Sequence, residues 1–108
     1  MKKIICLILT LFLISCAAPT SQEIPAGAIQ VDIKDFAFNP DPIRIKAGQT
    51  IVWINQDSVG HTVTAVDGSW DSGDLFKGQS WSQTFNSAGE FEYYCALHPD
   101  MKGKVIVE

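Results

Sequence analysis

Three side chains that commonly bind metals lie three residues apart near the end of the chain. Cys95, His98 and Met101 follow the spacing Cys-x2-His-x2-Met, flanked by Pro99 and Gly103. Taken singly, a cysteine or a methionine is most often a buried apolar residue, and a histidine is most often a surface or hydrogen-bonded one. A loop can turn three such side chains toward one point, which a strand of period two cannot do. The spacing therefore predicts a ligand loop between two strands.

The ligand types favour copper over other metals. Thiolate and thioether sulfurs are soft ligands that suit copper better than magnesium, calcium or manganese. Structural zinc prefers four ligands from cysteine and histidine, and the chain offers only one other histidine, His61. Two histidines and one cysteine with a weak axial methionine are typical of a blue-copper electron-transfer site. We therefore predict one copper ion, cycling between Cu+ and Cu2+, bound by His61, Cys95, His98 and Met101.

The first fifteen residues have the features of a secretory signal peptide. Two lysines precede the apolar run 4–14, which is too short to cross a bilayer as a helix. The sequence LISC at 13–16 resembles the lipoprotein box of bacteria, which implies cleavage before Cys16 and lipid on that residue; two or more acyl chains would anchor it stably. Residues 16–28 are then a flexible tether. A buried N-terminal helix, or ordinary cleavage with Cys16 as a bystander, are the alternatives.

This processing decides both the thiol count and the charge. Cys6 leaves with the signal peptide and Cys16 carries lipid, so Cys95 is the single remaining thiol and no intramolecular disulfide forms. A single thiol in an oxidising compartment is reactive unless a ligand binds it. The net charge falls from 8 − 12 = −4 to 6 − 12 = −6 when Lys2 and Lys3 are lost. A mildly acidic small domain is not typical of nucleic-acid binding, and the charge suits a basic partner.

Residues 29–108 predict one all-β domain. Apolar and polar residues alternate with a period of two, and turn sequences separate the alternating segments. The pattern favours an antiparallel sandwich or barrel of seven or eight strands, with the three tryptophans and most phenylalanines in its core. The run 50–55 is almost wholly apolar and should be central. Strands are expected at residues 29–34, 43–46, 50–55, 61–66, 80–85, 90–95 and 102–108, with irregular structure over 67–77.

With these residues the chain resembles the cupredoxins, the small type 1 copper proteins, and within them the amicyanin and plastocyanin-like group. The resemblance covers residues 29–108. It rests on the strand 50–55 leading to His61 and on residues 93–105, whose short Cys-x2-His-x2-Met loop is similar to that of amicyanin. It implies a Greek-key β-sandwich. Thr62 stands where an asparagine is common in the group, and the resemblance implies that it contacts the ligands and tunes the metal.

The resemblance also implies a function, a membrane-tethered one-electron carrier that is not an enzyme. In the family the second histidine ligand reaches the surface through an apolar patch, which makes His98 the electron port and Ala96, Leu97 and Pro99 its patch. Leu97 could equally be a buried loop anchor. Brief docking with redox proteins needs only a small buried area, and we expect a monomer located in the periplasm or otherwise outside the cytoplasm.

Two other functions and one further property remain to be considered. The same ligands could trade copper with a partner, which would make the chain a copper-delivery protein of the cell envelope. A copper oxidase or nitrite reductase needs additional histidines for a second copper site, and both histidines are already used. By resemblance to amicyanin-like loops, we also hypothesise that His98 protonates and leaves the reduced metal.

Overall fold

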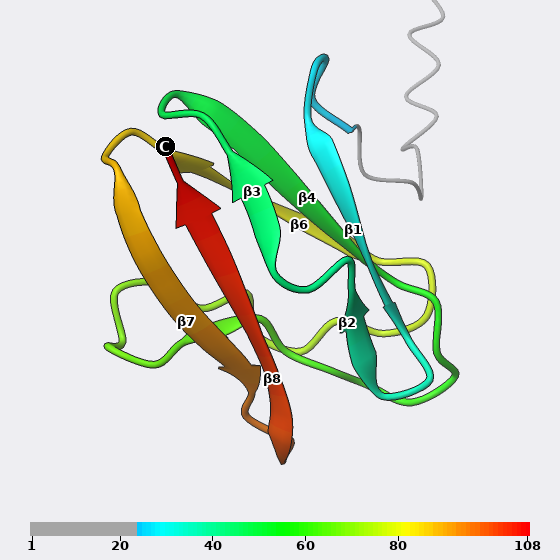
Figure 1. The fold of residues 1–108 in the computed structure, drawn as a ribbon. Helices are drawn as coiled ribbons and strands as arrows, with labels where there is room; N and C mark the ends of the chain where they lie inside the picture. The colour runs from blue at the N-terminus through cyan, green and yellow to red at the C-terminus, as the bar shows by residue number, and fades with distance from the viewer. Residues whose placement is uncertain (1–23) are drawn as a thin grey trace, which may run out of the picture.

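The computed structural model describes residues 24–108, which form two β-sheets and contain no helix (Figure 1). The first sheet has the strand order β2 (Ala37–Asn39), β1 (Ile29–Lys34), β4 (Gln49–Asn55) and β6 (Ser80–Phe85). The second has the order β3 (Ile43–Ile45), β8 (His98–Val107), β7 (Gly89–Cys95) and β5 (Thr64–Ala65). The expected all-β sandwich of seven or eight strands is confirmed. Within residues 24–108, the strands lie between residues 29 and 107.

The predictions for the N-terminus fall on other residues. The signal peptide (1–15), the lipid site at Cys16 and most of the tether (16–28) lie outside the described residues. Residues 24–108 include no helix long and apolar enough to cross a membrane.

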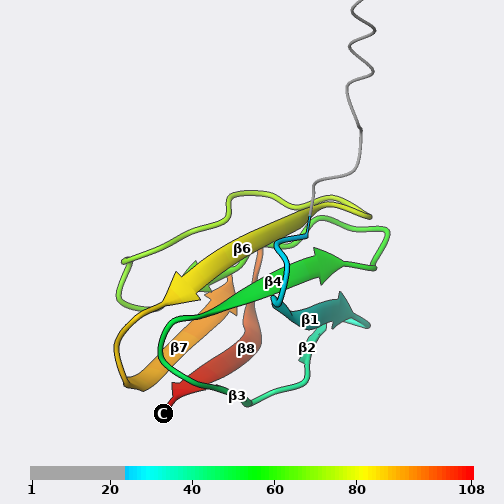
Figure 2. The same cartoon turned by 90° about the horizontal axis from the view of Figure 1, so that it is seen from above.

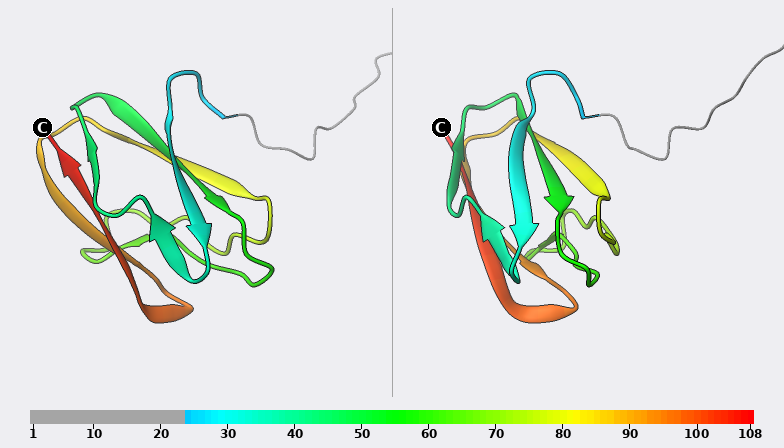
Figure 3. Two further views of the ribbon diagram at one scale, coloured as in Figure 1. Left: turned by 45° about the vertical axis from the view of Figure 1, so that its right-hand side comes forward. Right: turned by 90° about the vertical axis from the view of Figure 1, so that its right-hand side faces the viewer.

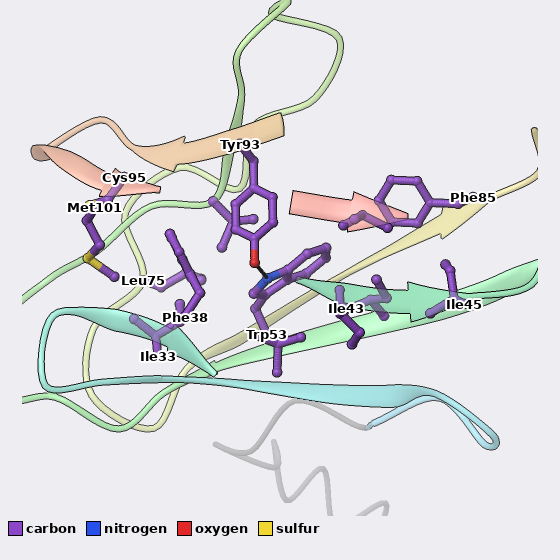
Figure 4. Close-up of a cluster of buried hydrophobic side chains, with 14 of the residues drawn as sticks. Ile33, Phe38, Ile43, Ile45, Trp53, Leu75, Phe85, Tyr93, Cys95 and Met101 are labelled. Carbon is purple, nitrogen blue, oxygen red and sulfur yellow. Dashed lines mark hydrogen bonds between the residues drawn. The ribbon is translucent and has the colours of Figure 1, made fainter. Parts of the chain in front are cut away.

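The two sheets pack face to face and enclose one apolar core (Figures 2 and 3). Trp53, on the central strand β4, is fully buried, as the apolar run predicted. Its indole Nε1–H donates a hydrogen bond of 3.2 Å to the hydroxyl of Tyr93 on β7 in the opposite sheet (Figure 4). Buried polar groups need such partners, so this bond ties the two sheets together inside the core.

Two strand pairs correct the expectation of a purely antiparallel sandwich. β1 runs parallel to β4, with Val31 opposite Trp53, and β3 runs parallel to β8, with Ile43 opposite Val105. Period-two alternation shows which face of a strand is buried, but it does not show the direction of the neighbouring strand. Here β2 and β3 lie between β1 and β4 in the chain and belong to different sheets, and this crossing brings β4 beside β1 in the same direction.

The strand expected at residues 61–66 is mostly absent, because only Thr64–Ala65 form β5. The preceding residues pair with the irregular segment instead of a sheet. The Val63 amide donates to the Ser72 hydroxyl at 2.8 Å, and the Ser72 amide donates to the Val63 carbonyl at 2.9 Å. Among the described phenylalanines, Phe38 and Phe85 lie in the core and Phe91 packs against it, as expected, whereas Phe36 and Phe76 are more than half exposed.

The expected ligand loop is instead a tight hairpin with an irregular strand. β7 ends at Cys95 and β8 begins at His98, so only Ala96 and Leu97 connect them. Tyr94 pairs with Lys102 while the next residue, Cys95, pairs with His98, which leaves the three residues 99–101 of β8 without partners. This bulge replaces the regular alternation of β8 at the positions where His98 and Met101 lie.

Candidate metal centre

His61 is held rigidly at one end of the sandwich. Its side chain is fully buried. Its backbone forms an isolated two-bond bridge with Leu75, in which the His61 amide donates at 3.0 Å and the Leu75 amide donates back at 2.7 Å. Asn55, at the end of β4, is also fully buried, and its side-chain amide donates to the carbonyls of Val59 and Leu75. The loop that leads to His61 is therefore fixed from both sides.

The β7–β8 hairpin brings Cys95 and His98 to the same end. The Cys95 sulfur is fully buried and lies 3.7 Å from His61 Nδ1 and 3.6 Å from His98 Nδ1. The ligand atoms of these three residues all lie within 4.8 Å of one another. Three residues that are separated by up to 37 positions in the chain thus converge on one point.

These separations fit a single metal ion. With a metal–nitrogen bond of about 2.0 Å and a metal–sulfur bond of about 2.3 Å, separations of 3.6 and 3.7 Å subtend angles of about 114° and 119° at a common metal. Such angles are near the 120° of a trigonal plane, the arrangement of two histidines and a cysteine that copper favours in electron-transfer sites. The donor set matches copper, and the two sulfur–nitrogen separations are compatible with one ion bound between the three residues.

Asp57 orients the His61 ring. Its carboxylate lies 2.8 Å from His61 Nε2, and a carboxylate can only accept, so Nε2 carries the proton. In a neutral imidazole the lone pair is then on Nδ1, the nitrogen that faces the Cys95 sulfur. Burial of the Asp57 carboxyl acts to raise its pKa, but hydrogen bonds from the Phe36 and Asp35 amides and from His61 lower the pKa below its ordinary value. The carboxylate is thus ionised and held in place.

Thr62 connects the two chain segments that carry the ligands. Its backbone amide donates to the Cys95 sulfur at 3.3 Å, and its hydroxyl accepts a hydrogen bond of 2.7 Å from the Ala96 amide. The Thr64 hydroxyl, 2.8 Å away, donates its own proton to Asp71, so the Thr62 hydroxyl must donate to Thr64. The hydrogen bond from the Thr62 amide places a partial positive charge beside the Cys95 sulfur.

The fourth predicted ligand, Met101, is buried in the same cluster as Cys95. Figure 4 shows both side chains at one end of the core.

The predicted port residues lie on the surface beside His98. Ala96 and Pro99 are exposed, Leu97 is half exposed and His98 is partly buried, so Leu97 is not a buried anchor. Phe36 and Phe76 also expose large apolar areas. A Cβ placed on Gly60 would lie 3.4 Å from the Phe76 ring and 3.7 Å from Leu97, so both side chains border that glycine.

The sequence did not indicate three residues that contact the site or the loop leading to it: Asp57, Asn55 and Phe36. Asp57 had a visible signal, since it is a carboxylate four residues before a histidine in a short loop. The Phe36 ring packs edge-on against the rings of His61 and His98. Phe36 had no such signal, because this contact depends on the β1–β2 turn reaching the β7–β8 hairpin in space. Figures 1 and 3 show these two turns at the same end of the molecule.

A family model, two sequence relatives and a solved structure all point to the same protein family. A model of the cupredoxin-like domain matches residues 3–107. Amicyanin-alpha of Methylorubrum extorquens is 39% identical over 92 residues, covering 81% of this chain and 77% of the relative. Plastocyanin of Scenedesmus fuscus is 31% identical over 86 residues, covering 68% and 88%. The structure of the Cu(I) form of an amicyanin variant superposes with a TM-score of 0.76 at 36% identity, covering 80% of this chain and 87% of that one.

Proposed function

The chain belongs to the cupredoxin family, and we propose that it is a blue-copper protein that carries single electrons between redox partners. One observation carries the proposal: a buried cysteine sulfur lies 3.6 and 3.7 Å from two imidazole nitrogens within a rigid sandwich. Copper bound there would supply one-electron chemistry by alternating between Cu+ and Cu2+. The chain's own residues would hold that ion, keep water away and connect it to the surface.

Each ligand would have a separate task. Cys95 and the two histidines would form the trigonal set, and Met101 would be the weak axial ligand that tunes the potential. The Thr62 amide would stabilise the thiolate, and Asp57 would fix the His61 ring. Because the ligands are supplied by packed and hydrogen-bonded elements, they would move little between oxidation states. Small rearrangement is what a fast electron carrier requires.

The surface around His98 would be the contact area for partners. Leu97 and Phe76 are exposed apolar side chains that both border Gly60, and Ala96 and Pro99 border His98. A small apolar patch suits brief docking, because little area is buried and few charges must be desolvated. We propose that partners are redox proteins that receive or supply electrons through His98, and that the chain acts as a monomer.

We also propose that the protein works outside the cytoplasm, anchored by lipid on Cys16. The support comes from the sequence: the signal peptide 1–15, the LISC motif and the polar tether 16–28. Metabolic labelling with a fatty acid would test the anchor. Label that is retained by the full chain and lost by Cys16→Ala is expected, whereas equal labelling of both would contradict it.

Voltammetry of copper-loaded residues 17–108 tests the carrier function against copper delivery. A carrier should give a reversible one-electron wave whose size persists over many cycles, because both oxidation states stay bound. If the wave decays as copper leaves in one oxidation state, the protein is a delivery protein and the carrier proposal is wrong.

A further inference from the structure

The turn between β1 and β2 has an unusual composition for its shape. Lys34 pairs with Ala37, so Asp35 and Phe36 form a two-residue hairpin turn. Both residues have positive φ angles, 53° and 56°. Turns of this kind favour Asn-Gly or similar pairs, because residues with a bulky side chain are strained in the left-handed region. An aromatic residue at the second position therefore needs support from outside the turn.

Asp57 supplies that support. Its carboxylate accepts both amides of the turn, from Asp35 at 2.8 Å and from Phe36 at 3.0 Å. The oxygen that accepts the Phe36 amide is also the one that accepts His61 Nε2. The Asp57 amide in turn donates to the side chain of the fully buried Asn55 at 2.8 Å. One anchored carboxylate thus joins the strained turn to a histidine of the metal centre.

This arrangement places the Phe36 ring against the rings of both histidines. Its centroid lies 5.1 Å from that of His61 and 5.0 Å from that of His98, with interplanar angles of 89° and 84°. Both contacts are edge-to-face, which is a favourable geometry for aromatic rings. The ring stays 52% exposed, so burial in the core does not account for its presence at a strained position.

The two histidines differ in what holds them. Asp57 fixes the distal nitrogen of the His61 ring by a hydrogen bond. Among residues 24–108, the His98 ring has no such partner, and its one hydrogen-bonding contact is from Nδ1 to the Cys95 sulfur. Two rings pack on the His98 ring at a centroid distance of 5.0 Å, those of Phe36 and His61. Since His61 would itself be a metal ligand, Phe36 is the contact from outside the ligand set that can fix the orientation of His98.

We propose that Phe36 is a positioning residue that fixes the His98 ring, and that Asp57 holds both histidines, His61 by a hydrogen bond and His98 through Phe36. This inference rests on the proposed function in that the ring it positions is the port for electrons. The positive φ angle of Phe36 is then the conformation that brings its ring onto the histidines of the metal centre. Replacing Phe36 by glycine should therefore leave the sandwich at least as stable as before, because the strain is relieved. The His98 ring should lose order in the same variant.

The first experiment uses metal-free protein, so that it does not depend on copper chemistry. Residues 17–108 are compared as wild type, Phe36→Gly, Phe36→Leu and the control Phe76→Leu, which removes another exposed aromatic ring of the same end. NMR relaxation of the ring carbons reports the order of each histidine. We expect both Phe36 variants to lose order at His98 while His61 stays rigid, with Phe36→Gly at least as resistant to urea as wild type. A rigid His98 ring in Phe36→Gly would overturn the proposal.

The second experiment measures copper release from the loaded protein into excess chelator. We expect release to be about tenfold faster in Phe36→Gly, the factor that corresponds to losing an aromatic contact of about 1.4 kcal/mol. Phe76→Leu should release copper at the wild-type rate. Equal rates in Phe36→Gly and wild type would contradict the proposal. If wild type forms no copper–thiolate centre, the proposed function fails, and the metal-free measurement still decides the role of Phe36.

Discussion

Replacing Thr62 by valine should loosen the metal centre without changing the shape of the side chain. The hydroxyl accepts the Ala96 amide at 2.7 Å and donates to Thr64 at 2.8 Å, and Thr62 is only 3% exposed. Each lost hydrogen bond is worth about 0.5–1.5 kcal/mol, so Thr62→Val should lower the free energy of unfolding by about 1–3 kcal/mol. The Thr62 amide, and with it the bond to the Cys95 sulfur, is unaffected by the change.

Urea unfolding of metal-free residues 17–108 measures this effect, and Thr84→Val is a matched control. Thr84 bonds the Thr50 hydroxyl at 2.7 Å, but that pair is exposed on the outer face of the β4–β6 pair. Exposed substitutions of this kind usually change stability by less than about 0.5 kcal/mol. Two variants that unfold within about 0.5 kcal/mol of each other would refute the view that the Thr62 hydroxyl links the ligand-bearing segments.

Three further predictions concern the core and the axial ligand. Gly103→Ala should destabilise the fold by about 1–3 kcal/mol in urea unfolding, because its Cβ would lie 2.6 Å from the Tyr93 hydroxyl and closer still to its ring; an unchanged midpoint would contradict this packing. Burial raises the pKa of Tyr93 well above its ordinary value, against the smaller effect of the Trp53 bond, so stability is full below the unfolded pKa of about 10 and falls by about 1.4 kcal/mol per pH unit above it. Tyr93→Phe should lack this component of the slope, and equal slopes in urea titrations of both proteins at pH 9–11 would be evidence against it. Met101→Leu should keep copper and raise the reduction potential in voltammetry, by about 59 mV for each tenfold loss of Cu2+ affinity relative to Cu+, whereas an unchanged potential would exclude Met101 as a ligand.

The sequence predicted those features of the molecule that depend on neighbouring residues in the chain. Alternation in residues 29–34 and the apolar run around Trp53 predicted β1 and β4, and the ligand types at Cys95 and His98 predicted copper. Alternation could not predict that β1 and β4 are parallel, because it reports the buried face and not the neighbour.

What could not be predicted depends on contacts between distant segments. The carboxylate of Asp57 binds amides 21 and 22 residues earlier in the chain, and nothing in the local sequence around residue 35 indicates this. The bulge at residues 99–101 likewise arises from the pairing of Cys95 with His98 beside the regular pairing of Tyr94 with Lys102. The candidate ligands could be predicted from their chemistry, whereas the residues that hold them could be found only from the fold.

The most direct test of the central claim is the absorption spectrum of residues 17–108 after addition of one equivalent of Cu2+, compared with Cys95→Ser. A trigonal site with a copper–thiolate bond should give an intense blue band in the wild type, and the serine variant, which lacks the thiolate, should be colourless. A colourless wild-type protein, or a band that survives in Cys95→Ser, would contradict the assignment of Cys95, His61 and His98 as one copper centre.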